Sequence, residues 1–151
     1  MKVIVSACLL GENTKYNGSN NKNEELLKLL KGHEIISVCP EVFGGLPIPR
    51  YPAEIRDSKV INSHHEDVTN EYIKGANFSL KKALDNNAKL AILQSRSPSC
   101  GYLKIYDGTF SKKLIDGNGI FVQFLLKNNI EVIDVSDMKK IREKLSHENI
   151  F

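Results

Sequence analysis

The three cysteines of this chain are the first candidates for a functional site, because each follows a short, largely apolar run in the sequence. Cys8 comes directly after the run at residues 3–7 and Cys39 directly after the run at 35–38, while Cys100 closes a polar stretch behind a third run. Runs of this kind are typical of buried strands. Parallel strands bring their carboxyl ends to one edge of a sheet, where ligands bind in open α/β folds. We therefore expect three sulfurs that are far apart in the sequence to share one site.

A shared metal or catalytic site is one interpretation of these cysteines, and inert core thiols are the other, since free cysteine packs like a small hydrophobic residue. The odd number of cysteines, with no secretory signal, argues against a disulfide framework and predicts a cytoplasmic protein. No cysteine pair or cysteine–histidine spacing typical of zinc is present. The histidine pair His64-His65 lies in a polar stretch and is a weak candidate for a ligand.

Three thiolates favour an iron–sulfur cluster over a closed structural site. A cube of four irons normally takes four cysteine thiolates, so three would leave one iron open for chemistry. In a metal-free alternative, one cysteine attacks a substrate and a second resolves the intermediate. That alternative has weaker support, because no histidine lies near any of the three cysteines in the sequence to activate a thiolate.

Polar side chains beside the cysteines are candidates for acid–base work and for ligand binding. Glu41 stands two residues after Cys39, where a carboxylate can accept the proton of an attacking water. An ion pair with Arg50 or Arg96 is the alternative role for Glu41. These arginines and Arg56 fall in loops behind candidate strands, and a guanidinium group suits carboxylates, phosphates or flat heterocycles. Arginines that only bond loop carbonyls would give the same pattern.

The elements that must position these residues alternate between strand and helix. We expect a small Rossmann-like α/β domain of three layers, with a central parallel sheet and right-handed crossovers, that forms a single iron–sulfur cluster-binding domain over residues 1–151. Thr69 and Ser136 are expected to cap the second and last helices. The predicted strands span residues 2–7, 34–38, 89–93 and 130–135, and the predicted helices span 23–31, 70–86, 120–128 and 137–145.

The segment at 42–68 contains Pro47, Pro49 and Pro52, which exclude a regular helix or a central strand there. Long ordered loops in compact domains are usually functional. A short hairpin around Asp57-Ser58 would let this segment fold over the site as a lid. Asp107-Gly108 predicts a second, tight hairpin within residues 105–110.

Composition limits the classes of partner. The net charge is +3 and the lysines are spread along the chain, which permits nucleic-acid binding without requiring it. No segment reaches the length of a membrane span, so we expect no membrane partner. We expect a monomer or a weak homodimer.

Several blocks of sequence together resemble the 2-thiouracil desulfurase family, in an order that runs from residue 6 to about residue 133. The sequence departs from the family pattern in two places: Asn17 replaces an expected aspartate, and Phe121-Val122 replaces smaller residues. The blocks that carry the resemblance are SACLLG at 6–11, YNG at 16–18, CPE at 39–41, GGLPIPR at 44–50, PAE at 52–54, GA at 75–76, SRSPSCG at 95–101 and YDGTF at 106–110.

The resemblance implies a [4Fe-4S] cluster whose open iron binds the sulfur of a thiolated pyrimidine. Under that resemblance the cluster and metal ligands are Cys8, Cys39 and Cys100. The catalytic pair falls on Glu41 and on one serine of the 95–101 stretch, which we place at Ser97, with Ser95 and Ser99 as alternatives. The expected substrate contacts are Asn17, Arg50, Arg96 and Ser99.

The expected reaction is a non-redox, hydrolytic desulfuration of a small 2-thiouracil-like pyrimidine. A soft thiocarbonyl sulfur is expected to bind a thiolate-held iron, which draws electron density from the carbon. Water can then add to that carbon, and sulfide leaves as the carbonyl forms. A desulfurase for a thiolated nucleoside or a tRNA base is one alternative. A non-catalytic iron–sulfur or thiol redox sensor is another, and it would not turn over.

Overall fold

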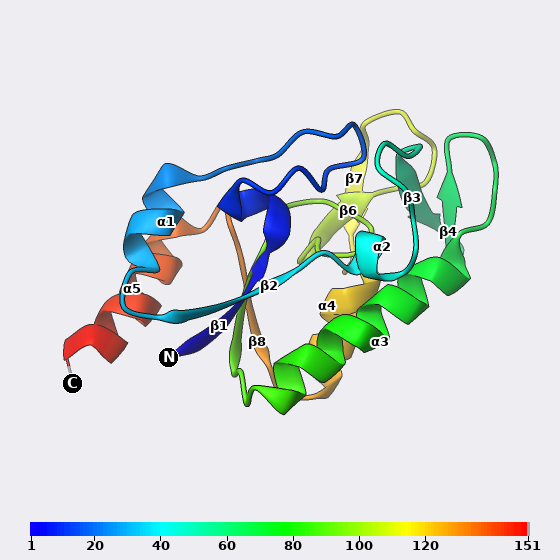
Figure 1. The fold of residues 1–151 in the computed structure, drawn as a ribbon. Coiled ribbons are helices and arrows are strands. Elements are labelled where there is room, and N and C mark those ends of the chain that lie inside the picture. Colours follow the sequence, from blue (N-terminus) through cyan, green and yellow to red (C-terminus); the bar gives the residue numbers. More distant parts are fainter. Residues whose placement is uncertain (151) are drawn as a thin grey trace.

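The computed structural model of the protein describes residues 1–150, and its side chains through residue 146. Its centre is a parallel sheet with the strand order β2-β1-β5-β8 (Figure 1). All three pairings in this sheet are parallel. The expected Rossmann-like α/β class is therefore confirmed. The strands span Lys2–Ser6 (β1), Glu34–Val38 (β2), Leu90–Leu93 (β5) and Glu131–Asp134 (β8).

Helices cover both faces of this sheet, which explains why its central strands are apolar on both sides. Val3 and Val5 of β1 belong to one core cluster and Ile4 belongs to the other, as expected for alternating side chains. The first cluster includes Leu26 of helix α1 and Ile141 of helix α5, and the second includes residues of α3 and α4. The helices span Glu24–Leu29 (α1), Thr69–Asp85 (α3), Ile120–Lys127 (α4) and Met138–Ile150 (α5).

Two antiparallel hairpins and two short helices lie outside these layers. The hairpin expected around Asp57-Ser58 is present, and both turn residues have a positive φ, 52° and 65°. Such a turn matches the twist of paired strands. The hairpins are β3 (Ala53–Arg56) with β4 (Lys59–Asn62) and β6 (Lys104–Tyr106) with β7 (Leu114–Asp116), and the short helices are the 3-10 helix η1 (Ala7–Leu10) and α2 (Pro40–Phe43).

The tight turn expected at Asp107-Gly108 is wrong, because β6 pairs with β7 across the longer loop 107–113. The Asp107 carboxylate accepts hydrogen bonds from the Thr109 N–H and hydroxyl, which folds the loop on itself.

The expected caps of two helices also differ from the structure. Thr69 is the first residue of α3, and its hydroxyl oxygen accepts the Val60 N–H instead of capping the helix. At the start of α5, the Asp137 carboxylate accepts the Lys140 N–H, so Asp137 takes the place expected for Ser136.

Helices α2 and α3 touch through their backbones at two glycines. A Cβ atom on Gly75 would lie 1.6 Å from the Pro40 carbonyl oxygen, and one on Gly44 would lie 2.0 Å from the Glu71 carbonyl oxygen. Close packing explains the glycine inside α3, and its partner is α2 instead of the sheet. Since α2 follows Cys39 directly, this contact fixes the backbone that carries both Cys39 and Glu41.

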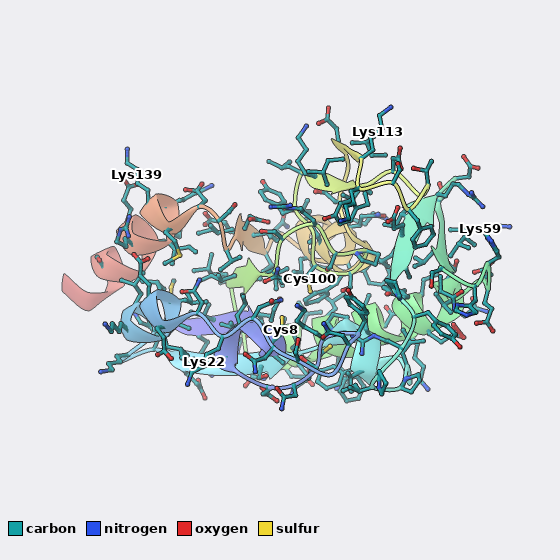
Figure 2. The ribbon with its side chains drawn as sticks, turned by 90° about the horizontal axis from the view of Figure 1, so that it is seen from above. Cys8, Lys22, Lys59, Cys100, Lys113 and Lys139 are labelled. Carbon is teal, nitrogen blue, oxygen red and sulfur yellow. The ribbon has the colours of Figure 1, made fainter. Side chains whose placement is uncertain are left out.

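The lysines and the cysteines lie in different parts of the molecule. Figure 2 shows Lys22, Lys59, Lys113 and Lys139 around the periphery, with Cys8 and Cys100 near the centre. No helix in the described part of the chain is both long and apolar enough to cross a bilayer.

Candidate active site

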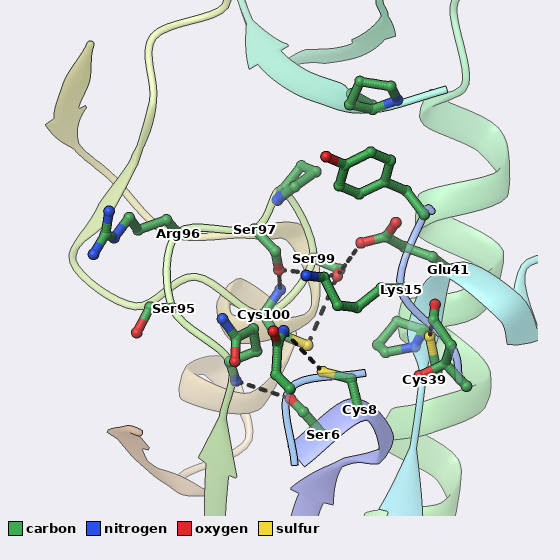
Figure 3. A pocket seen from close by; sticks show the side chains of 18 of the residues that line it. Ser6, Cys8, Lys15, Cys39, Glu41, Ser95, Arg96, Ser97, Ser99 and Cys100 are labelled. Carbon is green, nitrogen blue, oxygen red and sulfur yellow. Dashed lines mark hydrogen bonds between the residues drawn. The ribbon is translucent and has the colours of Figure 1, made fainter. Parts of the chain in front are cut away.

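The three cysteines line one cavity of about 670 Å³ at the carboxyl edge of the sheet (Figure 3). Cys8 lies in η1 behind β1, and Cys39 lies between β2 and α2. Cys100 follows β5 after a short connection. Strand β1 has β2 on one side and β5 on the other, so the three strand ends are neighbours. The structure thus brings together the sulfurs that the sequence predicts to converge, and all three cysteines are free thiols.

The thiols are buried or half-buried, and this burial raises the pKa of Cys8 and Cys39 and raises the pKa of Cys100 to about 12. Polar neighbours approach the sulfurs. Asn21 Nδ2 lies 3.8 Å from Cys8 Sγ, and Ser99 Oγ lies 3.7 Å from Cys100 Sγ. Metal ligands must be thiolates, so binding of a metal at this site has to release protons.

The donor set fits an iron–sulfur cluster better than a single ion. Within the described residues, no group of three or more His, Cys, Asp or Glu side chains is placed to hold one metal ion. A cube distributes its thiolates over separate irons, so it needs sulfurs arranged around a larger space. His64 does not line the cavity and instead stacks on Tyr51 with ring centroids 3.5 Å apart.

Glu41 lies in the first turn of α2 and faces the cavity with its carboxylate held at both oxygens. Arg50 Nε donates to Oε1 over 3.0 Å, and Ser99 Oγ donates to Oε2 over 2.8 Å. Arg50 is itself fixed, because its Nη2 donates to the Thr14 carbonyl oxygen over 2.8 Å. Burial and the Glu41 carboxylate together raise the pKa of the adjacent Tyr72 well above its ordinary value. Glu41 therefore lines the cavity and also forms, with Arg50, the ion pair that was the alternative interpretation of this residue.

The three serines before Cys100 have different partners. Ser99 is buried and contacts Glu41, while Ser97 Oγ lies 3.3 Å from Ser99 Oγ and accepts the Cys100 N–H over 2.7 Å. Ser95 Oγ instead donates to Asp134 Oδ2 over 2.6 Å. The serine that contacts Glu41 is thus Ser99, and the Ser97 hydroxyl lies beside the Ser99 hydroxyl.

The predicted substrate contacts divide into two groups. Arg50, Arg96 and Ser99 line the cavity. Asn17 does not line it, and its side-chain oxygen accepts hydrogen bonds from the Ser19 N–H and hydroxyl inside an exposed turn. The structure therefore does not bring Asn17 to the site.

Some residues that line the cavity were not among the site candidates expected from the sequence, and Lys15 is one of them. Lys15 comes from the loop behind η1, and its side chain extends toward Ser99 (Figure 3). Three more belong to the β6–β7 hairpin and its loop: Tyr106 and Phe110, which the sequence offered only as part of the YDGTF block, and Lys112.

The chain is similar to known proteins in both sequence and fold. A family model described as 2-thiouracil desulfurase matches residues 3–137. The chain is 38% identical over 149 residues to the uncharacterized protein YbbK of Bacillus subtilis (strain 168), a match that covers 92% of this chain and 99% of that protein. A solved structure of a [4Fe-4S]-dependent thiouracil desulfidase, TudS, is similar with a TM-score of 0.89 and 36% identity, covering 96% of this chain and 97% of that one.

Proposed function

The chain belongs to the 2-thiouracil desulfurase family and is an iron–sulfur-dependent desulfurase, and we propose that Cys8, Cys39 and Cys100 hold its [4Fe-4S] cluster. The observation that carries this proposal is the meeting of three free thiols and one carboxylate around a single cavity. We further propose that the substrate is a small thiolated pyrimidine such as 2-thiouracil.

When bound, the cluster supplies an iron without a protein ligand, a soft Lewis acid for a thiocarbonyl sulfur. The chain itself supplies proton transfer. Glu41 accepts a proton from the water that attacks the carbon, and Arg50 keeps the carboxylate aimed into the cavity. As the carbonyl forms, the carbon–sulfur bond breaks and the sulfur leaves with its bonding electrons as sulfide, so water and thiouracil give uracil and hydrogen sulfide.

The serines extend this proton path. Ser99 donates to Glu41, and its oxygen lies 3.3 Å from the Ser97 hydroxyl. Once Glu41 is protonated, it can donate to the Ser99 oxygen. The Ser99 hydroxyl can then turn to donate to Ser97, which passes its own proton toward the departing sulfide. Ser97 is held in place because it accepts the Cys100 N–H. In this proposal Ser99 is a relay, and Ser97 stays the catalytic serine.

The proposal is tested with protein prepared without oxygen. We expect about four irons and four acid-labile sulfides per chain, and release of uracil and sulfide from 2-thiouracil over many turnovers. The nucleoside 2-thiouridine, assayed in parallel, tests whether a sugar is accepted. Glu34→Gln, which changes an exposed carboxylate on β2, is the control variant and should match the parent.

Two results would contradict the proposal. Protein that carries zinc alone, or that releases uracil without any bound iron, would exclude the cluster. Protein that binds the cluster and thiouracil but never turns over would instead be a sensor.

A further inference from the structure

One carboxylate joins the two hairpins that cover the cavity. Glu54 lies on β3, and its Oε1 accepts the backbone N–H of Gly108 over 3.0 Å and that of Phe110 over 3.1 Å. Both donors belong to the loop 107–113 between β6 and β7. Hydrogen bonds to an ionised acceptor are about twice as strong as neutral ones. Glu54 therefore holds a loop that lies more than fifty residues away in the sequence.

The backbone conformation of the loop 107–113 is costly, and the hydrogen bonds to Glu54 stabilise it. Phe110 has a φ of 59°, in the left-handed region that non-glycine residues enter only at a cost. Gly108 has a φ of 93°, and a Cβ atom placed on it would lie 2.9 Å from the Ile55 carbonyl oxygen. The loop thus rests directly on strand β3, and one of its residues can be nothing larger than glycine.

The same loop forms one wall of the cavity. Phe110 and Lys112 line the cavity together with Tyr106, and Glu54 lines it from the facing hairpin. Phe110 is 37% exposed as a residue, although its side chain is a large apolar group. Aromatic rings offer a large apolar contact surface to flat heterocycles at little entropic cost. No hydrogen bond among the described residues links Glu54 to Glu41 or to the serines of the proton path.

We propose that Glu54 is a positioning residue for the substrate, which keeps loop 107–113 in place so that Phe110 packs against the thiolated pyrimidine ring. This inference rests on the proposed function of the same cavity. Phe110 is the specificity-determining contact, and Glu54 acts through it. Since neither side chain takes part in proton transfer, their loss should weaken binding and leave the chemical step unchanged.

Steady-state kinetics with 2-thiouracil test the inference. Glu54→Ala should raise KM about tenfold and change kcat by less than about twofold, which is the pattern of lost substrate binding. Glu54→Gln keeps an oxygen acceptor in the same place and should restore KM to within about threefold of the parent. Glu34→Ala, which removes an exposed carboxylate from β2, is the matched control and should leave both constants unchanged.

Two further variants separate loop position from a general loss of structure. Phe110→Ala should raise KM as Glu54→Ala does, and the double variant should be little worse than the worse single one, because both remove one interaction. Gly108→Ala perturbs the loop without touching a charge and should also raise KM. Hydrogen exchange of the peptide that carries Gly108 and Phe110 should become faster in Glu54→Ala, in cluster-free protein as well as in loaded protein.

Several outcomes would overturn the inference. They are an unchanged KM in Glu54→Ala, a fall in kcat at constant KM, strictly additive effects in the double variant, and unchanged exchange of the loop. Failure of the proposed function is a different result, in which the parent itself binds 2-thiouracil by calorimetry but releases no sulfide. In that case the calorimetric Kd replaces KM, and the same variants still decide the inference.

Discussion

The floor and the roof of the cavity are built in different ways. The floor is the carboxyl edge of β1, β2 and β5, with the three cysteines behind it. The roof consists of the hairpins β3–β4 and β6–β7 with the loop 107–113. Strands of the floor are paired along the central sheet and packed by helices on both faces, whereas each roof hairpin has only two strands.

Because of this difference, substitutions in the floor and in the roof should have different effects on the protein. Positions in the floor follow from the hydrophobic core, so a change there affects the groups proposed to hold the cofactor and to move protons. The position of the loop 107–113 in the roof depends on a few hydrogen bonds between side chains and backbone, such as those that Glu54 accepts. Changes in the roof should therefore alter which substrate binds, and how tightly, before they alter the reaction.

The largest effect is expected in the floor, from replacing Cys8, Cys39 or Cys100 singly by serine. Each variant should lose the cluster and fall to background turnover, because a hydroxyl is a poor ligand for iron that prefers soft thiolates. The free energy of unfolding of the cluster-free protein should fall by no more than about 3 kcal/mol, and most in Cys100→Ser, because Cys100 is buried in the core. Iron analysis and urea unfolding measure the two quantities. Unfolding of all three variants would show a structural metal.

Glu41→Gln should have the next largest effect. The amide keeps the shape of the side chain but cannot take the proton of water, so kcat should fall roughly 10²- to 10⁴-fold. Iron content and the change in the cluster spectrum on adding thiouracil should stay as in the parent. A variant with near-normal turnover and full iron content would remove Glu41 from the mechanism.

The serines give a smaller, graded effect within the floor. Ser99→Ala breaks the contact with Glu41 and should lower kcat about tenfold or more, and Ser97→Ala should lower it to a similar extent if both hydroxyls belong to one path. Ser95→Ala serves as the control, because its hydroxyl bonds Asp134 instead. Full activity in both Ser97→Ala and Ser99→Ala would exclude the relay.

The smallest effect is expected at the tip of the roof. Ser58 has a φ of 65°, which glycine adopts at no steric cost. Ser58→Gly should raise the free energy of unfolding by at most about 1 kcal/mol, because relief of strain is partly offset by backbone entropy. Its kcat should match the parent. A loss of turnover comparable with that of Glu41→Gln would place the hairpin tip in the chemistry and break the distinction between floor and roof.

The sequence predicts the floor well because periodic apolar runs determine it. Apolar runs predict the strands that precede Cys8 and Cys39. The parallel order around β1 agrees with the rule that ligands bind at the carboxyl ends of parallel strands. The hairpin at Asp57-Ser58 was predictable for a similar reason, since its turn residues tolerate a positive φ.

The roof and the finer contacts of the floor were less predictable, because tertiary hydrogen bonds decide them. The loop 107–113 takes its shape from Asp107 and Glu54, and the local signature of a tight turn is overridden. Asn17 forms a local turn that no pattern distinguishes from a substrate contact. The contact between Ser99 and Glu41 spans 58 residues, so spacing alone could not identify which serine lies next to the carboxylate.

The order of the strands also bears on how the protein is made in the cell. Strand β1 lies between β2 and β5, so the three thiols meet only after both neighbours have paired with it. A chain still on the ribosome has no complete site until Cys100 has emerged, because the last of the three thiols lies two thirds of the way along the sequence. If these three thiols hold the cluster, as proposed, the cluster has to be inserted into a domain whose central strands are already assembled.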